Sequence, residues 1–96
     1  MNQVVLVGRI TEKPNLEENR TNIKLAVQRA FKNSDGIYET DFINCILWNG
    51  IASSACEYCE PGDVVGIKGR LQSDGKKVEI IAERISFLSS VKIGEE

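Results

Sequence analysis

Apolar and polar residues alternate with a period of two over much of this chain, the spacing that puts every second side chain on one face of a β-strand. Residues 23–29 (IKLAVQR) show the alternation most clearly, and residues 4–7 (VVLV) form a continuous β-branched and apolar run. Such segments, bounded by glycine, proline, asparagine and aspartate, predict strands. The predicted strands cover residues 3–10, 23–29, 40–48, 64–71 and 77–88.

The segments between these strands predict one helix and several turns. Residues 17–22 are polar and predict a loop, while Asp-Gly pairs predict hairpin turns within residues 33–36 and 73–75. Residues 51–60 place small side chains at helical spacing and end at Pro61-Gly62, which predicts one short helix. Three strands, a helix and two strands, with glycines inside the strands, predict an all-β protein. The architecture expected is an OB-fold, a five-stranded Greek-key barrel with its helix between strands three and four.

Length and composition favour one globular domain. The chain has 96 residues, of which 42% are hydrophobic and 27% charged, which suits a single core. We expect the barrel to span residues 1–90 and residues 91–96 to form a short frayed tail. The N-terminus shows no export signal and no apolar run approaches the length of a membrane span, so we expect a cytoplasmic protein.

The residue types argue against catalysis and cofactor binding. Histidine is absent, which removes the commonest general base and metal ligand, and no glycine-rich phosphate loop is present. Cys56 and Cys59 match C-x-x-C, but no second pair completes a zinc site, and the odd total of three cysteines favours reduced thiols. We therefore expect no enzyme activity, no metal and no cofactor. A redox role of Cys56 and Cys59 stays open as the alternative.

The strand predicted at residues 40–48 has two faces of different character. One face carries the medium-sized side chains that suit a barrel interior: Ile43, Cys45 and Leu47. The other face consists of Phe42, Asn44, Ile46 and Trp48, and so carries both large rings of the strand. A small barrel lacks room for both sets, so we expect Phe42 and Trp48 outside, where flat rings can stack on the bases of a single nucleic-acid strand. The alternative is that both rings pack in a core or a subunit interface.

The charges give weaker evidence for such a surface. The net charge is −2, from 12 basic and 14 acidic residues, so contact with phosphates depends on where the cations lie. Several cations stand beside predicted strand ends, glycines or aromatic positions: Arg9, Arg29, Lys32, Lys68, Arg70, Lys76 and Lys77. The alternative is that they are scattered over a solvated surface.

In these residues the chain resembles the bacterial and phage single-stranded DNA-binding proteins of the SSB family. The matching segments follow one another along nearly the whole chain: residues 1–11 with Pro14, 25–31, 41–48, 58–63 and 66–72, then Glu83 and 87–88. The resemblance implies an OB-fold that binds and protects single-stranded DNA without sequence preference in replication, recombination and repair. It implies base stacking on Phe31, Phe42 and Trp48. It also implies phosphate or base contacts from Arg9, Arg29, Lys32, Asn44, Lys68, Arg70, Lys76, Lys77 and Arg84.

Three departures from the family pattern bear on these expectations. The hairpin at residues 73–75 is short where the family often has a further aromatic, and Glu17-Glu18 stand where the family tends toward arginine. A long tail with the acidic-hydrophobic tip that recruits replication partners is absent, so we do not expect recruitment through such a tip. The alternative function is that of an SSB-like OB-fold adaptor of the primosomal type, which acts mainly by docking on other proteins.

The first strand also predicts self-association. Residues 4–7 are apolar on both faces, which makes an exposed sheet edge unfavourable, so we expect this strand to pair with its copy in a second chain. The resemblance favours a homotetramer, with a dimer as the alternative. It leaves open whether a chromosome, a plasmid or a phage encodes the protein.

Overall fold

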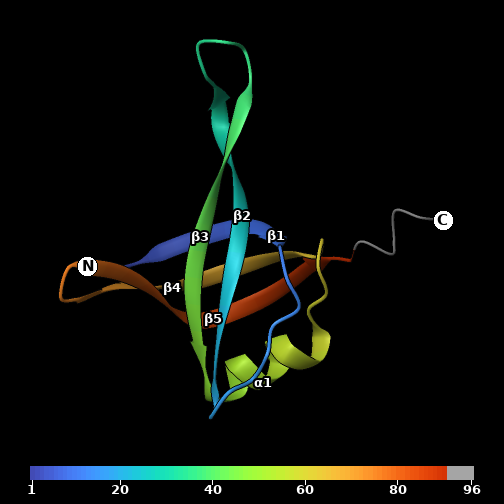
Figure 1. Ribbon diagram of the computed structural model, residues 1–96, viewed down its shortest axis with the longest axis vertical. Helices are drawn as coiled ribbons and strands as arrows, with labels where there is room; N and C mark the ends of the chain where they lie inside the picture. The colour runs from blue at the N-terminus through green and yellow to red at the C-terminus, as the bar shows by residue number, and fades with distance from the viewer. Residues whose placement is uncertain (91–96) are drawn as a thin grey trace.

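The structure, a computed structural model, describes residues 1–90, which form a closed five-stranded barrel and one helix (Figure 1). Its elements are β1 Val4–Ile10, β2 Arg20–Lys32, β3 Tyr38–Trp48, α1 Asn49–Tyr58, β4 Val64–Asp74 and β5 Lys77–Ser89. Around the barrel the strands run β1-β2-β3-β5-β4, with β3 and β5 parallel and the other neighbours antiparallel. The predicted OB-fold is confirmed, including the helix between the third and fourth strands. The tail expected at residues 91–96 lies outside the described residues.

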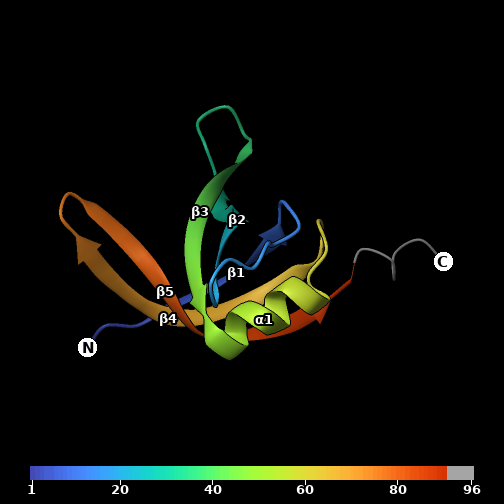
Figure 2. The same cartoon turned by 60° about the horizontal axis from the view of Figure 1, so that its bottom comes forward.

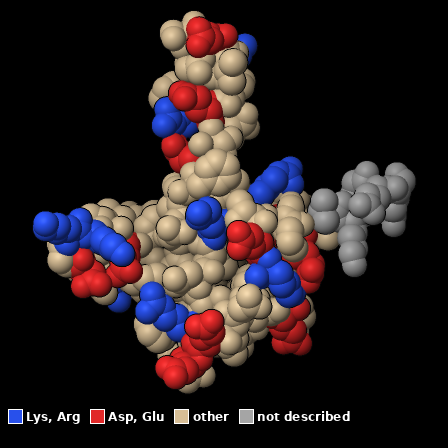
Figure 3. Space-filling model, in the orientation of Figure 1, with Lys and Arg blue, Asp and Glu red and all other residues tan. Residues whose placement is uncertain are grey.

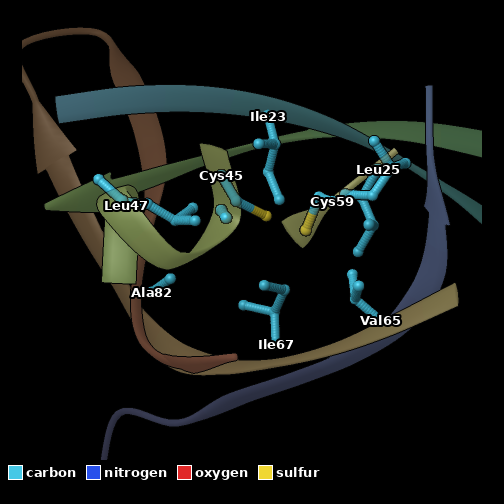
Figure 4. Close-up of a cluster of buried hydrophobic side chains, with 11 residues drawn as sticks. Ile23, Leu25, Cys45, Leu47, Cys59, Val65, Ile67 and Ala82 are labelled. Atoms are coloured by element: carbon cyan, nitrogen blue, oxygen red, sulfur yellow. The ribbon is translucent and has the colours of Figure 1, made fainter. Parts of the chain in front are cut away.

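The core fills the barrel and is closed at one end by α1, which lies across the lower opening (Figure 2). Ala52 and Ala55 of α1 are fully buried. The inward side chains of the strands meet Cys45 and Cys59 in the centre, as Figure 4 shows. Their removal from water is the main stabilising contribution of this small core. Within residues 1–90, no helix has the length and apolarity that a membrane crossing requires.

Two glycines allow the strands to approach closely enough to close the barrel. A Cβ atom at Gly8 would lie 2.5 Å from the carbonyl oxygen of Ala26. A Cβ atom at Gly69 would collide with the backbone carbonyl of Ile81, next to the register shift between β4 and β5. Glycine is therefore needed at both positions because any side chain would push neighbouring strands apart.

The second strand begins earlier than predicted. Residues 20–22, expected in a loop, belong to β2, because residues 17–20 form a tight turn rather than an open loop. Glu18 and Asn19 have φ values of 48° and 65°, the pair of positive angles that a type I′ turn requires. The turn carries the backbone directly into pairing with β3 at Trp48. Further along, β2 and β3 extend to Lys32 and from Tyr38, so their hairpin is longer than predicted and projects above the barrel (Figure 1).

The turn between β4 and β5 is shorter than predicted. Ser73 and Asp74 were expected in the turn but belong to β4, because Asp74 pairs with Lys77. The connection consists of Gly75 and Lys76. Gly75 has φ 62°, so glycine occupies the first central position, as in a type II′ turn, whereas the Asp-Gly pattern anticipates it at the second.

Candidate nucleic-acid interface

The outward side of the β2–β3 ladder carries two of the predicted rings. The strands pair antiparallel from Arg20 opposite Trp48 to Gln28 opposite Thr40, and directly opposed residues share a face. We call this outward side the β2–β3 face; its residues are Arg20, Asn22, Lys24 and Ala26 opposite Trp48, Ile46, Asn44 and Phe42. Phe42 is 62% exposed and Trp48 43%, so neither ring belongs to the core of the described chain. The charged residues of the face are two cations, Arg20 and Lys24, and it contains no carboxylate.

One member of this face behaves differently from the sequence expectation. Ile46 was grouped with the outer residues, yet it is only 6% exposed. It lies outside the barrel core but pairs directly with Ile81 of β5, which is 8% exposed. Because the two apolar side chains stand next to each other on parallel strands, each shields a flank of the other from water. Between the two exposed rings, Ile46 is thus a packed apolar position beside the exposed Asn44.

Two cations of the face were missed by sequence reasoning. The guanidinium carbon of Arg20 lies 5.2 Å from the ring centroid of Trp48 and above the ring, a cation–π contact. Lys24 is exposed and lies opposite Asn44. The signal that could have found them is the alternation of residues 23–29, which continues upstream through residues 20 and 22 and places Lys24 on the ring side of the strand. Assigning residues 17–22 to a loop concealed Arg20, whereas Lys24 lay inside the predicted strand and was overlooked.

The barrel brings two predicted cations toward the rings across neighbouring strands. Arg9 of β1 pairs with Ala26 of β2, which in turn pairs with Phe42 of β3, so Arg9 lies two strands from Phe42 with the small Ala26 between them. Its Nη1 donates to the carbonyl oxygen of Gly62 at 2.8 Å. Arg70 of β4 pairs with Ile81, the neighbour of Ile46, on the other side of the face. Its Nη1 donates to Gln72 Oε1 at 2.9 Å, and its Nε lies 3.5 Å from Glu83 Oε2.

A groove of about 660 Å³ continues from Trp48 past the start of α1. Arg70 and Arg84 line it together with Ile81 and Glu83. Arg84 also stands opposite Lys68, whose other neighbour is Val5 of β1. Arg84 therefore lies between the β2–β3 face and the outward side of β1, whereas Lys68 lies next to β1 itself.

Arg29 lies in a different environment from the one its sequence position suggests. Its Nε and Nη2 donate to the two oxygens of Asp41 at 3.0 and 2.9 Å, and its Nη1 donates to Glu39 Oε1 at 3.1 Å. The hydrogen bond to Asp41 raises the pKa of Arg29, and the guanidinium holds the pKa of Asp41 below its ordinary value. Asp41 is opposite Val27, on the side of the ladder away from Phe42. Arg29 is thus neutralised by carboxylates and faces away from the β2–β3 face.

The remaining predicted residues stand on the two hairpins. Phe31, 71% exposed, lies within the register shift between Gln28 and Lys32, on the hairpin that projects from the barrel. Lys32 Nζ lies 5.7 Å from the ring centroid of Tyr38. Lys76 and Lys77 stand at the tip of the β4–β5 hairpin. On the face seen in Figure 3, cations and carboxylates are interspersed, and both signs occur on the projecting hairpin.

The cysteines are free thiols. Cys45 and Cys59 are fully buried, and burial raises the pKa of each thiol to about 11. Both are therefore protonated at neutral pH, where the thiolate is the reactive form of cysteine. Cys56 is half-buried on α1. Among residues 1–90, no three histidine, cysteine, aspartate or glutamate side chains cluster as metal ligands would.

Residues 1–88 match a family model described as the "Single-strand binding protein family". The chain belongs to this family. A single-stranded DNA-binding protein of Bacillus cereus is 40% identical over 110 residues, covering 100% of this chain and 65% of the relative. Single-stranded DNA-binding protein B of Bacillus subtilis is 38% identical over 101 residues, covering 91% of this chain and 89% of the relative. The chain thus spans slightly less than two thirds of the Bacillus cereus relative's length.

Solved structures of the family share the barrel. The single-stranded DNA binding protein of Thermus aquaticus superposes with a TM-score of 0.74 at 26% identity, covering 95% of this chain and 52% of that chain. A Plasmodium falciparum SSB in complex with ssDNA superposes with a TM-score of 0.77 at 18% identity, covering 93% and 96%. At that identity the second likeness concerns the fold alone.

Proposed function

We propose that this protein binds and protects single-stranded DNA without sequence preference, by stacking bases on exposed rings and pairing phosphates with nearby cations. The observation that carries the proposal is the β2–β3 face, where Phe42 and Trp48 stand exposed beside Arg20 and Lys24 without a carboxylate among them. Rings stack on any base, and cations neutralise any phosphate, so such a face gives affinity without reading sequence. The names of the Bacillus relatives support the same conclusion.

The face is suited to binding rather than to catalysis. It offers rings, amides and cations, and the full sequence has no histidine. Base contacts would come from Phe42, Trp48 and Asn44, with Phe31 reached along the projecting hairpin. Phosphate contacts would come from Arg20, Lys24, Arg9, Arg70 and Arg84, and at greater distance from Lys68, Lys32, Lys76 and Lys77. Arg29 would contribute only if a phosphate displaced its carboxylate partners. Replication, recombination and repair are the processes in which such coating is required.

The test uses the fluorescence of Trp48, the single tryptophan, during titration with oligo-dT at two salt concentrations. Single strands should quench the emission, more weakly at the higher salt, and duplex DNA should leave it unchanged. Phe42→Ala should weaken binding by about 1–3 kcal/mol, the contribution of one stacked base. Phe87→Ala is the matched control, because Phe87 is a 48% exposed ring that packs edge-on against Tyr58, away from the face.

Absence of quenching in folded protein would contradict the proposal and favour the adaptor function, with Trp48 in an interface with another protein. Equal losses in the Phe42 and Phe87 variants would contradict the choice of surface, because both rings are comparably exposed and only Phe42 belongs to the face.

A homo-oligomer through β1 belongs to the same proposal, with a tetramer favoured over a dimer. Val5 and Val7 are 70% and 53% exposed on the outward side of β1. In the described chain β1 pairs with β4 from Val4 to Arg9, but with β2 only at Arg9 and Ile10. An apolar strand with one partly unpaired edge is a site where a second copy can add main-chain hydrogen bonds and cover valines.

A further inference from the structure

Arg20 covers the Trp48 ring from a position that the backbone holds rigidly. The two residues are opposite each other at the end of the β2–β3 ladder. Asn19, just before Arg20, and Asn49, just after Trp48, both have positive φ, and the Asn49 amide donates to the Asn19 carbonyl oxygen at 2.7 Å. The turn and the helix start are therefore joined behind the pair, so the side chain of Arg20 can move while its Cα stays beside the ring.

The guanidinium itself is lightly held. Its Nε donates to Asn22 Oδ1 at 3.4 Å, a long hydrogen bond, and no carboxylate among residues 1–90 lies within 4.0 Å of it. Arg29, by contrast, makes three hydrogen bonds to two carboxylates. The principal contact of Arg20 is the aromatic ring, which is also the surface that a base would occupy.

Two grooves adjoin the Arg20–Trp48 pair, and one of them is lined by carboxylates. A groove of about 970 Å³ runs beside β2 and is lined by Glu12, Glu17 and Glu18 as well as by Arg20 and Lys24. A second groove, of about 660 Å³, leads away from Trp48 on the other side. A single DNA strand that crosses Trp48 would bring its phosphates close to the carboxylates of the first groove. A cation is needed there to offset the repulsion between phosphates and carboxylates.

We propose that Arg20 is a displaceable cover of Trp48 that becomes a phosphate contact when single-stranded DNA binds. This inference rests on the proposed function. Stacking of a base on an aromatic ring generally exceeds an exposed cation–π contact, so an incoming base displaces the guanidinium. The released guanidinium offers a planar fork of donors that matches two phosphate oxygens. The same residue thus shields the ring in the free protein and neutralises the backbone of the bound strand.

The experiment compares Arg20→Gln with Lys13→Gln, a matched loss of one positive charge. Lys13 also lines the groove of about 970 Å³, but its charge is already offset, because its Nζ lies 2.6 Å from Glu60 Oε2 and donates to the Cys59 carbonyl oxygen. Affinity for oligo-dT is measured over a series of salt concentrations by Trp48 emission. In Arg20→Gln we expect a several-fold weaker affinity at low salt, a log–log salt slope reduced by about 0.7, and an altered emission spectrum of the free protein. Lys13→Gln should match the wild type in all three, and Arg20→Lys should keep the wild-type slope.

Each other result overturns the inference in a recognisable way. An unchanged slope in Arg20→Gln means that Arg20 does not reach a phosphate, and a tighter affinity means that it only blocks the ring. A reduced slope in Arg20→Lys despite the retained charge, with thermal unfolding unchanged, means that the slope does not report the charge. If neither the wild type nor Lys13→Gln binds oligo-dT, the proposed function itself fails and the inference with it.

Discussion

Two arginines of β2 show how the immediate partners of a side chain decide its role. Arg20 lies against a ring and has no carboxylate partner in the described chain, whereas Arg29 is engaged by Asp41 and Glu39. Both residues carry the same charge, but only a cation without a carboxylate partner can bind a phosphate without first losing an ion pair. Arg29 therefore acts first as a link between the two strands of the projecting hairpin. The small energy of exposed ion pairs means that this link is local rather than essential to the barrel.

The Arg29–Asp41 pair predicts a specific pH dependence. Because Arg29 lowers the pKa of Asp41 in the folded state, the pair contributes stability above the aspartate pKa of the unfolded chain. That contribution is lost as the pH falls through the lowered pKa. In an NMR titration, the Asp41 carboxyl should have a midpoint below the ordinary aspartate value, and Arg29→Gln should move it upward. An unmoved midpoint in the variant would contradict the assignment of the pair.

At the scale of the elements, the curvature of β4 depends on Gly69. The strand changes register against β5 between Lys68 and Gly69, and at this point the Ile81 backbone comes too close for any Cβ atom. A bulge with a close backbone approach is a common way to bend a strand into a barrel. The same bend brings Arg70 beside Ile81 and hence into the groove next to Trp48.

Gly69→Ala should therefore lower the free energy of unfolding by about 1–3 kcal/mol, because the backbone must shift to admit the methyl group. Gly50→Ala is the control. Gly50 lies in α1, and apart from its chain neighbours and the helix backbone no atom lies within 4 Å of the added Cβ, so this change should stabilise by up to about 1 kcal/mol. Urea denaturation measures both. Equal effects of the two substitutions would show that the contact with Ile81 is not what requires glycine at residue 69.

At the scale of the whole molecule, the barrel separates two kinds of surface. The β2–β3 face carries rings and cations although the chain as a whole has a net charge of −2. The β1 side carries Val5 and Val7 and adjoins Lys68 and Arg84. Closure of the barrel is what allows so small a chain to present two outward surfaces of different character.

The β1 side predicts the behaviour of a single substitution. Val5→Glu should lower the solution mass measured by light scattering toward the 10.7 kDa of one chain, because a carboxylate would have to be buried at the interface. Val78→Glu is a matched control, because Val78 is 68% exposed, close to the 70% of Val5, but lies near the tip of the β4–β5 hairpin. A wild-type mass of a single chain would contradict the oligomer directly.

Much of the architecture could be read from the sequence, because it depends on local patterns. Period-two alternation and turn residues predict the strands, and the order of elements predicts the OB-fold. The exposure of Phe42 and Trp48 was also predictable, because side chains of a regular strand alternate and the opposite face is aliphatic. The exact hairpin geometry was not, since type I′ and II′ turns differ only in which residues take positive φ.

What only the tertiary structure decided concerns partners on neighbouring strands. Ile46 is covered because β5 returns beside β3, Arg29 is neutralised because Asp41 lies across its hairpin, and Arg20 meets Trp48 through the register. The side of the hairpin occupied by Phe31 depends on a register shift that breaks the alternation. A chain pattern describes which way a side chain points from its own strand. What that side chain then contacts depends on residues far away in sequence, and folding alone brings them together.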